Sequence, residues 1–135
     1  MQFYINPTTQ MYYQYDDNHD FKKYPRPYGL VSCPVRPDFG VWIDGGWTID
    51  TQAQHNALLT AQLRAIDSAV TSALKKQHFD NQAQLQQYAA NNPDQYGTLN
   101  EWVYKINLFW DDVQSGSVAF ATVQDCINSI PKIGL

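Results

Sequence analysis

Charged residues are scarce in this chain of 135 residues, because Asp, Glu, Lys and Arg together make up only 16% of it. Soluble domains typically carry about 25%. Gln, Asn, Thr and Tyr supply most of the polarity instead, and a surface of that kind is weakly hydrated and pairs readily with other protein surfaces. The net charge of −4 leaves no positive field to attract phosphates, so we expect no nucleic-acid partner.

Long apolar runs are also missing from the sequence. No stretch approaches the 18 or so apolar residues that a membrane helix needs, and the first residues do not resemble a secretion signal. We therefore expect a soluble, unsecreted protein with no membrane segment. Cysteine is rare, and Cys33 and Cys126 lie far apart; in a protein made in the cytosol such thiols are typically reduced and buried rather than joined in a disulfide.

Motifs that carry chemistry are absent as well, including the Gly-x-Ser-x-Gly turn, a phosphate-binding Gly-rich loop and Cys-x-x-Cys. The acidic stretch 16–20 contains one histidine, but it lacks the central Gly and the distal Glu of a calcium loop, which favours a solvated loop. Asp111 and Asp112 are neighbours on a predicted helix, so their side chains point about 100° apart. Three histidines have no helical partner four residues away: His19, His55 and His78. We predict no enzyme activity, no metal site and no cofactor.

Aromatic and β-branched residues dominate the region 1–50, which we interpret as β-hairpins and loop. The stretches 3–5 and 11–15 flank a turn-forming segment at 6–10, which predicts a first hairpin with a five-residue loop. The segment 16–37 contains four prolines, and each proline removes a ladder donor. We therefore expect an extended connector there.

An Asp-Gly dipeptide between the stretches 41–43 and 47–49 predicts a second hairpin. Asp-Gly accepts positive φ at both central positions of a type I′ turn. Trp42 should then face Trp47 across the hairpin, and such an aromatic pair stabilises a sheet by up to about 1 kcal/mol.

The spacing of apolar residues changes at residue 51, from alternation to a helical period. Apolar residues recur at intervals of three and four over 51–77, which predicts one helix with an apolar seam. This seam needs a partner surface, either in its own chain or in another chain. It consists of Leu59, Leu63, Ile66, Val70 and Ala73.

Three shorter helices are predicted over 78–135. The first should run over 80–90 with Asp80 as N-cap, and the second should start at Thr98, which forms a capping box with Glu101. The third should start at Thr122 and end before Pro131, with its apolar side chains turned inward. Those inward side chains are Val123, Cys126, Ile127 and Ile130. The fold class is therefore α+β, with regions 1–50, 51–77 and 78–135.

The spacing of aromatic and cap residues over 40–131 resembles a small helical module near the ends of phage tail-fibre, tail-fibre-assembly and minor tail proteins. The matching positions are His78-Phe79-Asp80, Tyr88-Ala89, Asn92-Pro93, Trp102, Trp110, Gly116, Thr122-Val123 and Ile130-Pro131. The chain departs from that pattern in having Ala119-Phe120-Ala121 before Thr122 and Ile-Pro where Leu-Pro is usual. The resemblance implies a structural or assembly role in the virion tail, with synthesis in the bacterial host cytoplasm and no catalytic residues.

These observations predict a structural protein that binds tail-fibre or baseplate proteins and also associates with itself. A chaperone of tail-fibre assembly, lost from the finished particle, is an alternative interpretation. Exposed aromatic rings serve equally well as anchors in protein interfaces and as stacking surfaces for sugars, so a carbohydrate-binding module is a second alternative. The predicted interface residues are Leu59, Leu63, Ile66, Val70, Tyr12, Tyr13, Trp42 and Trp47.

Overall fold

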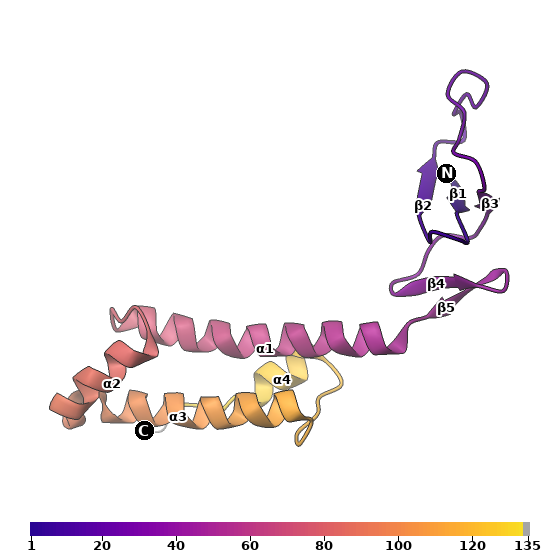
Figure 1. Ribbon diagram of the computed structural model, residues 1–135. Helices are drawn as coiled ribbons and strands as arrows, with labels where there is room; N and C mark the ends of the chain where they lie inside the picture. The colour runs from indigo at the N-terminus through magenta and orange to yellow at the C-terminus, as the bar shows by residue number, and fades with distance from the viewer. Residues whose placement is uncertain (134–135) are drawn as a thin grey trace. The chain divides into compact units, whose positions relative to one another are not determined.

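The computed structural model describes residues 1–133 and contains strands followed by helices, which confirms the predicted α+β class (Figure 1). The elements are β1 (Gln2–Ile5), β2 (Tyr12–Tyr15), β3 (Val31–Ser32), β4 (Gly40–Ile43), β5 (Gly46–Ile49), α1 (Thr51–Lys76), α2 (Gln82–Asn91), α3 (Pro93–Ser115) and α4 (Val123–Ser129). The chain forms two compact units, with the boundary between His55 and Asn56. We call them the β unit and the helical unit and describe each by itself.

The first sheet of the β unit has the strand order β2-β1-β3, and both pairings are antiparallel. As predicted for its turn, Asn6 folds back on its own backbone, since its Oδ1 accepts hydrogen bonds from the amides of Thr8 (2.9 Å) and Thr9 (3.2 Å). The loop spans 6–11, one residue longer than predicted. Strand β3 lies in the segment expected to be only a connector, because a two-residue strand defined by pairing with β1 leaves no local signal.

The second sheet is the predicted hairpin of β4 and β5. Asp44 (φ 53°) and Gly45 (φ 78°) both have positive φ, as a type I′ turn requires. Trp42 pairs with Trp47 in the register, and their ring centroids lie 5.1 Å apart at 78°. This confirms the predicted aromatic pair.

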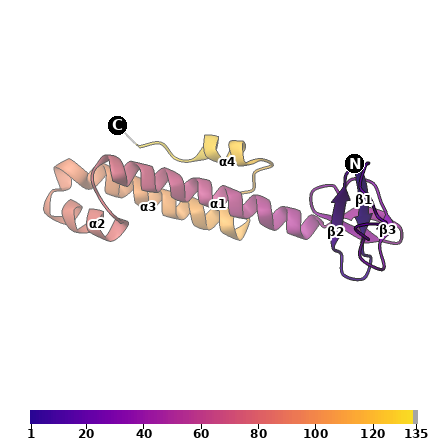
Figure 2. The ribbon, with the colours of Figure 1, turned by 90° about the horizontal axis from the view of Figure 1, so that it is seen from above.

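In the helical unit, α3 runs back alongside α1, α2 joins them at one end, and α4 lies against the pair (Figures 1 and 2). The buried side chain of Gln62 on α1 holds the segment before α4 in place. Its Nε2 donates hydrogen bonds to the carbonyls of Phe120 (3.0 Å) and Thr122 (3.2 Å). The Trp102 Nε1 donates to the carbonyl of Pro131 at 2.7 Å and fastens the segment after α4. No helix within residues 1–133 is apolar over a length that would cross a bilayer.

Two predicted helix starts are wrong. The N-cap of α2 is Asn81 rather than Asp80: its Oδ1 accepts a hydrogen bond from the Gln84 amide (2.8 Å), and the Gln84 Oε1 accepts one from the Asp80 amide (2.7 Å). Helix α3 starts at Pro93, five residues before Thr98. Proline is well suited to the first helical position, because an N–H there would have no helical partner. Thr98 therefore lies inside α3, and the predicted capping box of Thr98 and Glu101 does not form.

The predicted start of α4 is confirmed, because the Thr122 Oγ1 accepts a hydrogen bond from the Asp125 amide at 3.0 Å. The helix ends at Ser129, before Pro131, as predicted. Cys126 is fully buried, whereas Ile127 is 41% exposed. The expectation that Ile127 turns inward is therefore wrong, because a helix this short buries only one side of each turn.

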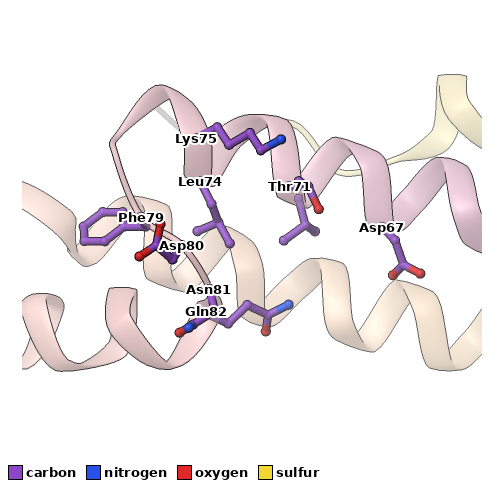
Figure 3. Close-up of a pocket in the computed structure, with 9 residues that line it drawn as sticks. Asp67, Thr71, Leu74, Lys75, Phe79, Asp80, Asn81 and Gln82 are labelled. Carbon is purple, nitrogen blue, oxygen red and sulfur yellow. The ribbon is translucent and has the colours of Figure 1, made fainter.

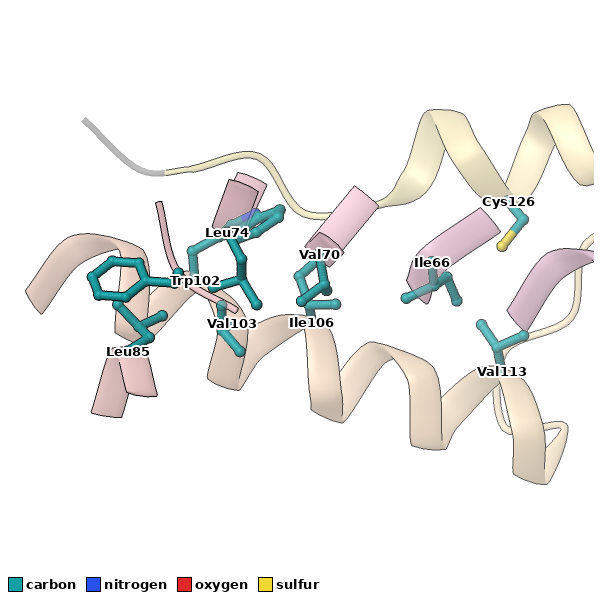
Figure 4. Packing of buried hydrophobic residues seen from close by; sticks show 10 residues of the cluster. Ile66, Val70, Leu74, Leu85, Trp102, Val103, Ile106, Val113 and Cys126 are labelled. Atoms are coloured by element: carbon teal, nitrogen blue, oxygen red, sulfur yellow. The ribbon is translucent and has the colours of Figure 1, made fainter. Parts of the chain in front are cut away.

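The core of the helical unit is formed by side chains from all four helices and the α1–α2 connection (Figure 4). It consists of Ile66, Val70, Leu74, Phe79, Leu85, Trp102, Val103, Ile106, Val113 and Cys126. Two seam residues, Ile66 and Val70, are thus covered by the chain's own helices. The interpretation that they contact a partner chain is wrong, because the apolar face of α3 already supplies the surface that the seam needs. Leu59 and Leu63 are partly buried against the same core.

Both cysteines are free and buried, as predicted, with Cys33 in the β unit and Cys126 in the helical unit. Burial disfavours the thiolate and raises the pKa of both thiols. A raised folded-state pKa contributes stability that is complete below the pKa of the unfolded thiol and is lost as pH rises through the folded value. The free energy of unfolding should therefore fall in the alkaline range above the ordinary thiol pKa.

The same burial predicts that Cys126 reacts with a thiol reagent such as Ellman's reagent only after the protein unfolds. Absorbance should show no reaction of Cys126 in a Cys33→Ala variant at pH 8, followed by one equivalent on adding denaturant. A Cys126→Ala variant isolates Cys33, which is 9% exposed, and should react slowly. Rapid stoichiometric reaction of the native Cys33→Ala variant would contradict the burial of Cys126.

Candidate interaction surface

Four aromatic rings connect the two sheets of the β unit. Phe3 stacks on Tyr12 with ring centroids 6.0 Å apart, Tyr12 contacts Trp47 edge to face at 5.9 Å, and Trp47 contacts Trp42 at 5.1 Å. We call this series the aromatic ladder. Its rings are all half-buried, so the ladder joins the sheets and still presents ring surface to solvent.

Two polar side chains hold the ladder in place by binding the outer edge of β4. The Gln10 amide makes two hydrogen bonds with the backbone of Trp42, accepting from its N–H (2.9 Å) and donating to its carbonyl (3.0 Å). The Arg36 guanidinium donates to the carbonyl of Gly40 through Nε (3.0 Å) and Nη2 (2.9 Å). The same guanidinium lies 5.7 Å from the centre of the Trp47 ring, where a cation is attracted by the π face.

The opposite face of the first sheet carries a second aromatic group. Tyr4, Tyr13 and Tyr15 lie on this face, because residues of one face alternate along a strand and Tyr4 is paired with Tyr13. Phe21 packs edge to face against Tyr4 (6.2 Å) and Tyr15 (5.2 Å). The Arg26 guanidinium lies 4.5 Å from the centre of the Tyr4 ring and 5.5 Å from that of Phe21. We call this group the tyrosine face.

The β unit buries few apolar side chains and exposes many. Its buried apolar residues are Tyr4, Ile5 and Cys33. Tyr28 is completely exposed, and several other large apolar side chains are between about two-fifths and three-fifths exposed. They are Met1, Met11, Tyr24, Val31, Val35, Phe39, Ile43 and Ile49. Apolar and aromatic surface of this kind, with few charges, is typical of the centre of protein interfaces.

The predicted interface residues fall into three groups. The structure brings Tyr12, Trp42 and Trp47 together in the aromatic ladder, and it places Tyr13 on the tyrosine face. Of the seam residues, Ile66 and Val70 belong to the core of the helical unit, and Leu59 and Leu63 pack against that core. Sequence reasoning missed Gln10 and Arg36, since a side chain that binds a distant strand edge has no local signature.

Two surface hollows are prominent among residues 56–133 of the helical unit. One has a volume of about 400 Å³ and lies between α1 and the α1–α2 connection; Asp67, Thr71, Lys75 and Asp80 give it a polar rim over Val70, Leu74 and Phe79 (Figure 3). The other, of about 410 Å³, lies between α1 and the first half of α3, over Ala73, Leu99 and Trp102. Within residues 1–133, no three His, Cys, Asp or Glu side chains come together as metal ligands.

Comparison with protein-family models, with curated proteins and with solved structures found no match to this chain.

Proposed function

We propose that this protein is a non-enzymatic structural protein that binds other protein chains through the aromatic surface of its β unit. The observation that carries this proposal is the imbalance in that unit, where three apolar side chains are buried and nine large ones are exposed. Burying such exposed apolar area contributes about 25 cal/mol per Å². A partner surface that covers these side chains would therefore stabilise a unit whose own core is small.

The spacing of aromatic and cap residues over 40–131 supports a place in a phage tail or tail fibre. In this proposal the partners are tail-fibre or baseplate proteins, the chain also associates with itself, and the finished protein resides in the virion tail. The cap residues Asn81 and Thr122 and the buried Trp102 fulfil structural roles in the helical unit. The proposal therefore assigns the contacts with partners to the β unit.

Quantitative mass spectrometry of purified phage particles tests this proposal. A structural tail protein should be present at a fixed ratio to the other tail proteins. Presence in infected cells and absence from finished particles would instead identify the assembly chaperone. Absence from both particles and complexes with tail proteins would contradict a tail function.

Carbohydrate binding is the second candidate, because the half-buried rings of the aromatic ladder could stack on a sugar. Sugar sites also need polar groups directed at hydroxyls, and the polar groups nearest the ladder are already occupied. The Trp47 Nε1 donates to the carbonyl of Pro34 (3.0 Å), and the Gln10 amide is bound to Trp42. This occupancy favours a protein partner.

A fluorescence titration with a panel of oligosaccharides separates the two candidates. Under the protein-binding proposal the emission of the wild-type protein should not change with sugar concentration. A saturable change that disappears in a Trp47→Leu variant, and persists in a Tyr104→Leu variant of the helical unit, would favour the carbohydrate module. Tyr104 is 64% exposed and serves as the matched control.

A further inference from the structure

The outer edge of β2 carries backbone groups that point away from the sheet. In an antiparallel pair, alternate residues direct both backbone groups toward the neighbouring strand. The Asn6 amide donates to the carbonyl of Met11 (2.9 Å), so Met11, Tyr13 and Tyr15 face β1. Tyr12 and Gln14 therefore direct their N–H and C=O groups outward, where β2 is the last strand of its sheet.

The edges formed by β4 and β3 differ from the edge of β2. The outer edge of β4 is covered at Trp42 by the Gln10 amide and at Gly40 by Arg36. Strand β3 has only two residues, which gives a partner strand little to bind.

Natural proteins often block the pairing of an edge strand with charged side chains or proline. The sequence of β2 is Tyr-Tyr-Gln-Tyr, which contains neither. Its four-residue edge therefore lacks both kinds of protection. Strand β5 is equally long and also has neither charge nor proline, but its central position between Trp47 and Ile49 is a threonine, whereas in β2 the central position is Tyr13.

We propose that β2 pairs antiparallel with β2 of a second copy of this chain, centred on Tyr13. This register places Tyr12 of one copy opposite Gln14 of the other. Each of the two opposed pairs then exchanges two backbone hydrogen bonds, so the four outward groups of each strand are satisfied. The two three-stranded sheets become one continuous six-stranded sheet.

The side chains of β2 suit pairing with a second copy of the same strand. Tyr13 of each copy lies opposite itself in a non-hydrogen-bonded pair, where side chains are closest and aromatic pairs are favourable. The acidic residues Asp16 and Asp17 follow β2 and come to opposite ends of the antiparallel pair. A parallel arrangement would instead place these carboxylates side by side, so charge favours the antiparallel pairing.

The pairing deepens the proposed function, because it names one partner of the β unit. A contact of one short strand per copy is smaller than the roughly 1,600 Å² of a standard stable interface. The dimer should therefore form at high concentration and dissociate on dilution. Sedimentation velocity over a range of concentrations measures this equilibrium.

Tyr13→Lys and Tyr13→Glu variants test the register. Because the pairing places residue 13 opposite itself, each variant alone opposes like charges and should dimerise about tenfold more weakly than the wild type. An equimolar mixture of the two should recover dimerisation at low salt. A misfolded variant would not regain association on mixing, so recovery distinguishes a charge effect from a folding defect.

Two further variants complete the test. Gln14→Pro removes an outward N–H without touching the hydrogen bonds to β1, and it should abolish the dimer. The same charge changes at the exposed Tyr104 of the helical unit should leave the dimer unchanged. A wild-type protein that stays monomeric at high concentration, or a mixture no more associated than its separate variants, would overturn the pairing. The tail function would be unaffected by that result, because the composition of the particle decides it separately.

Discussion

Replacing Ile66 by alanine is expected to lower the free energy of unfolding of the helical unit by about 2–5 kcal/mol. Ile66 is fully buried, and it meets Val113 and Cys126 where α1, α3 and α4 converge (Figure 4). Truncation removes buried apolar surface and leaves a cavity that the surrounding helices only partly close. Urea denaturation followed by far-UV circular dichroism measures the loss, since the helices dominate that signal.

Leu108→Ala on α3 is the matched control, because Leu108 is 49% exposed and its truncation should cost less than about 1 kcal/mol. The comparison also decides where the seam of α1 packs. If Ile66 contacted a partner chain instead of its own helices, the isolated protein would lose no more stability from Ile66→Ala than from Leu108→Ala.

Replacing Gly40 by alanine is expected to destabilise the β unit by about 1–3 kcal/mol. A Cβ at Gly40 would lie 2.9 Å from both the Cδ and the carbonyl oxygen of Pro37, and backbone atoms cannot move aside as a flexible side chain can. The Gly40 amide also donates to that carbonyl (3.0 Å). The shift needed to relieve the contact would thus weaken the hold of Arg36 on Gly40.

Hydrogen exchange of the peptide 38–50, followed by mass spectrometry, reports the local opening of this hairpin. Exchange should accelerate in Gly40→Ala. Gly46→Ala is the control. Apart from Gly46 itself and its two chain neighbours, no residue has an atom within 4 Å of the added Cβ, so exchange should be unchanged or slightly slower. Equal exchange in the two variants would mean that the close approach at Pro37 does not constrain the hairpin.

Local sequence signals predicted the elements whose chemistry is local. The Asp-Gly turn specified the hairpin of β4 and β5, because positive φ at both turn positions is a property of those two residues. The seam of α1 and the N-cap at Thr122 were predicted for the same reason. The helix starts at Asp80 and Thr98 were wrong because several cap residues compete within a few positions, and the structure uses Asn81 and Pro93.

The sequence predicted which aromatic residues belong to the candidate surface, but not which of them contact one another. The concentration of aromatic residues in the two hairpins made Tyr12, Tyr13, Trp42 and Trp47 candidates. Their division between the aromatic ladder and the tyrosine face depends on how the two sheets of the β unit pack. The same holds for Arg36, whose contacts with Gly40 and Trp47 depend on the path of a proline-rich segment.

The sequence by itself determined the α+β class, the hairpin turn and the seam, because periodicity and turn chemistry act over a few neighbouring residues. It also fixed a composition that is poor in charge and rich in aromatic residues. Only the tertiary structure decided which surfaces remain free. In that structure α3 covers Ile66 and Val70, and the side chains of Gln10 and Arg36 bind the edge of β4. Strand β2 remains at the edge of its sheet. Such outcomes follow from contacts between residues distant in sequence, where the geometry of packing and not the local pattern selects the partner.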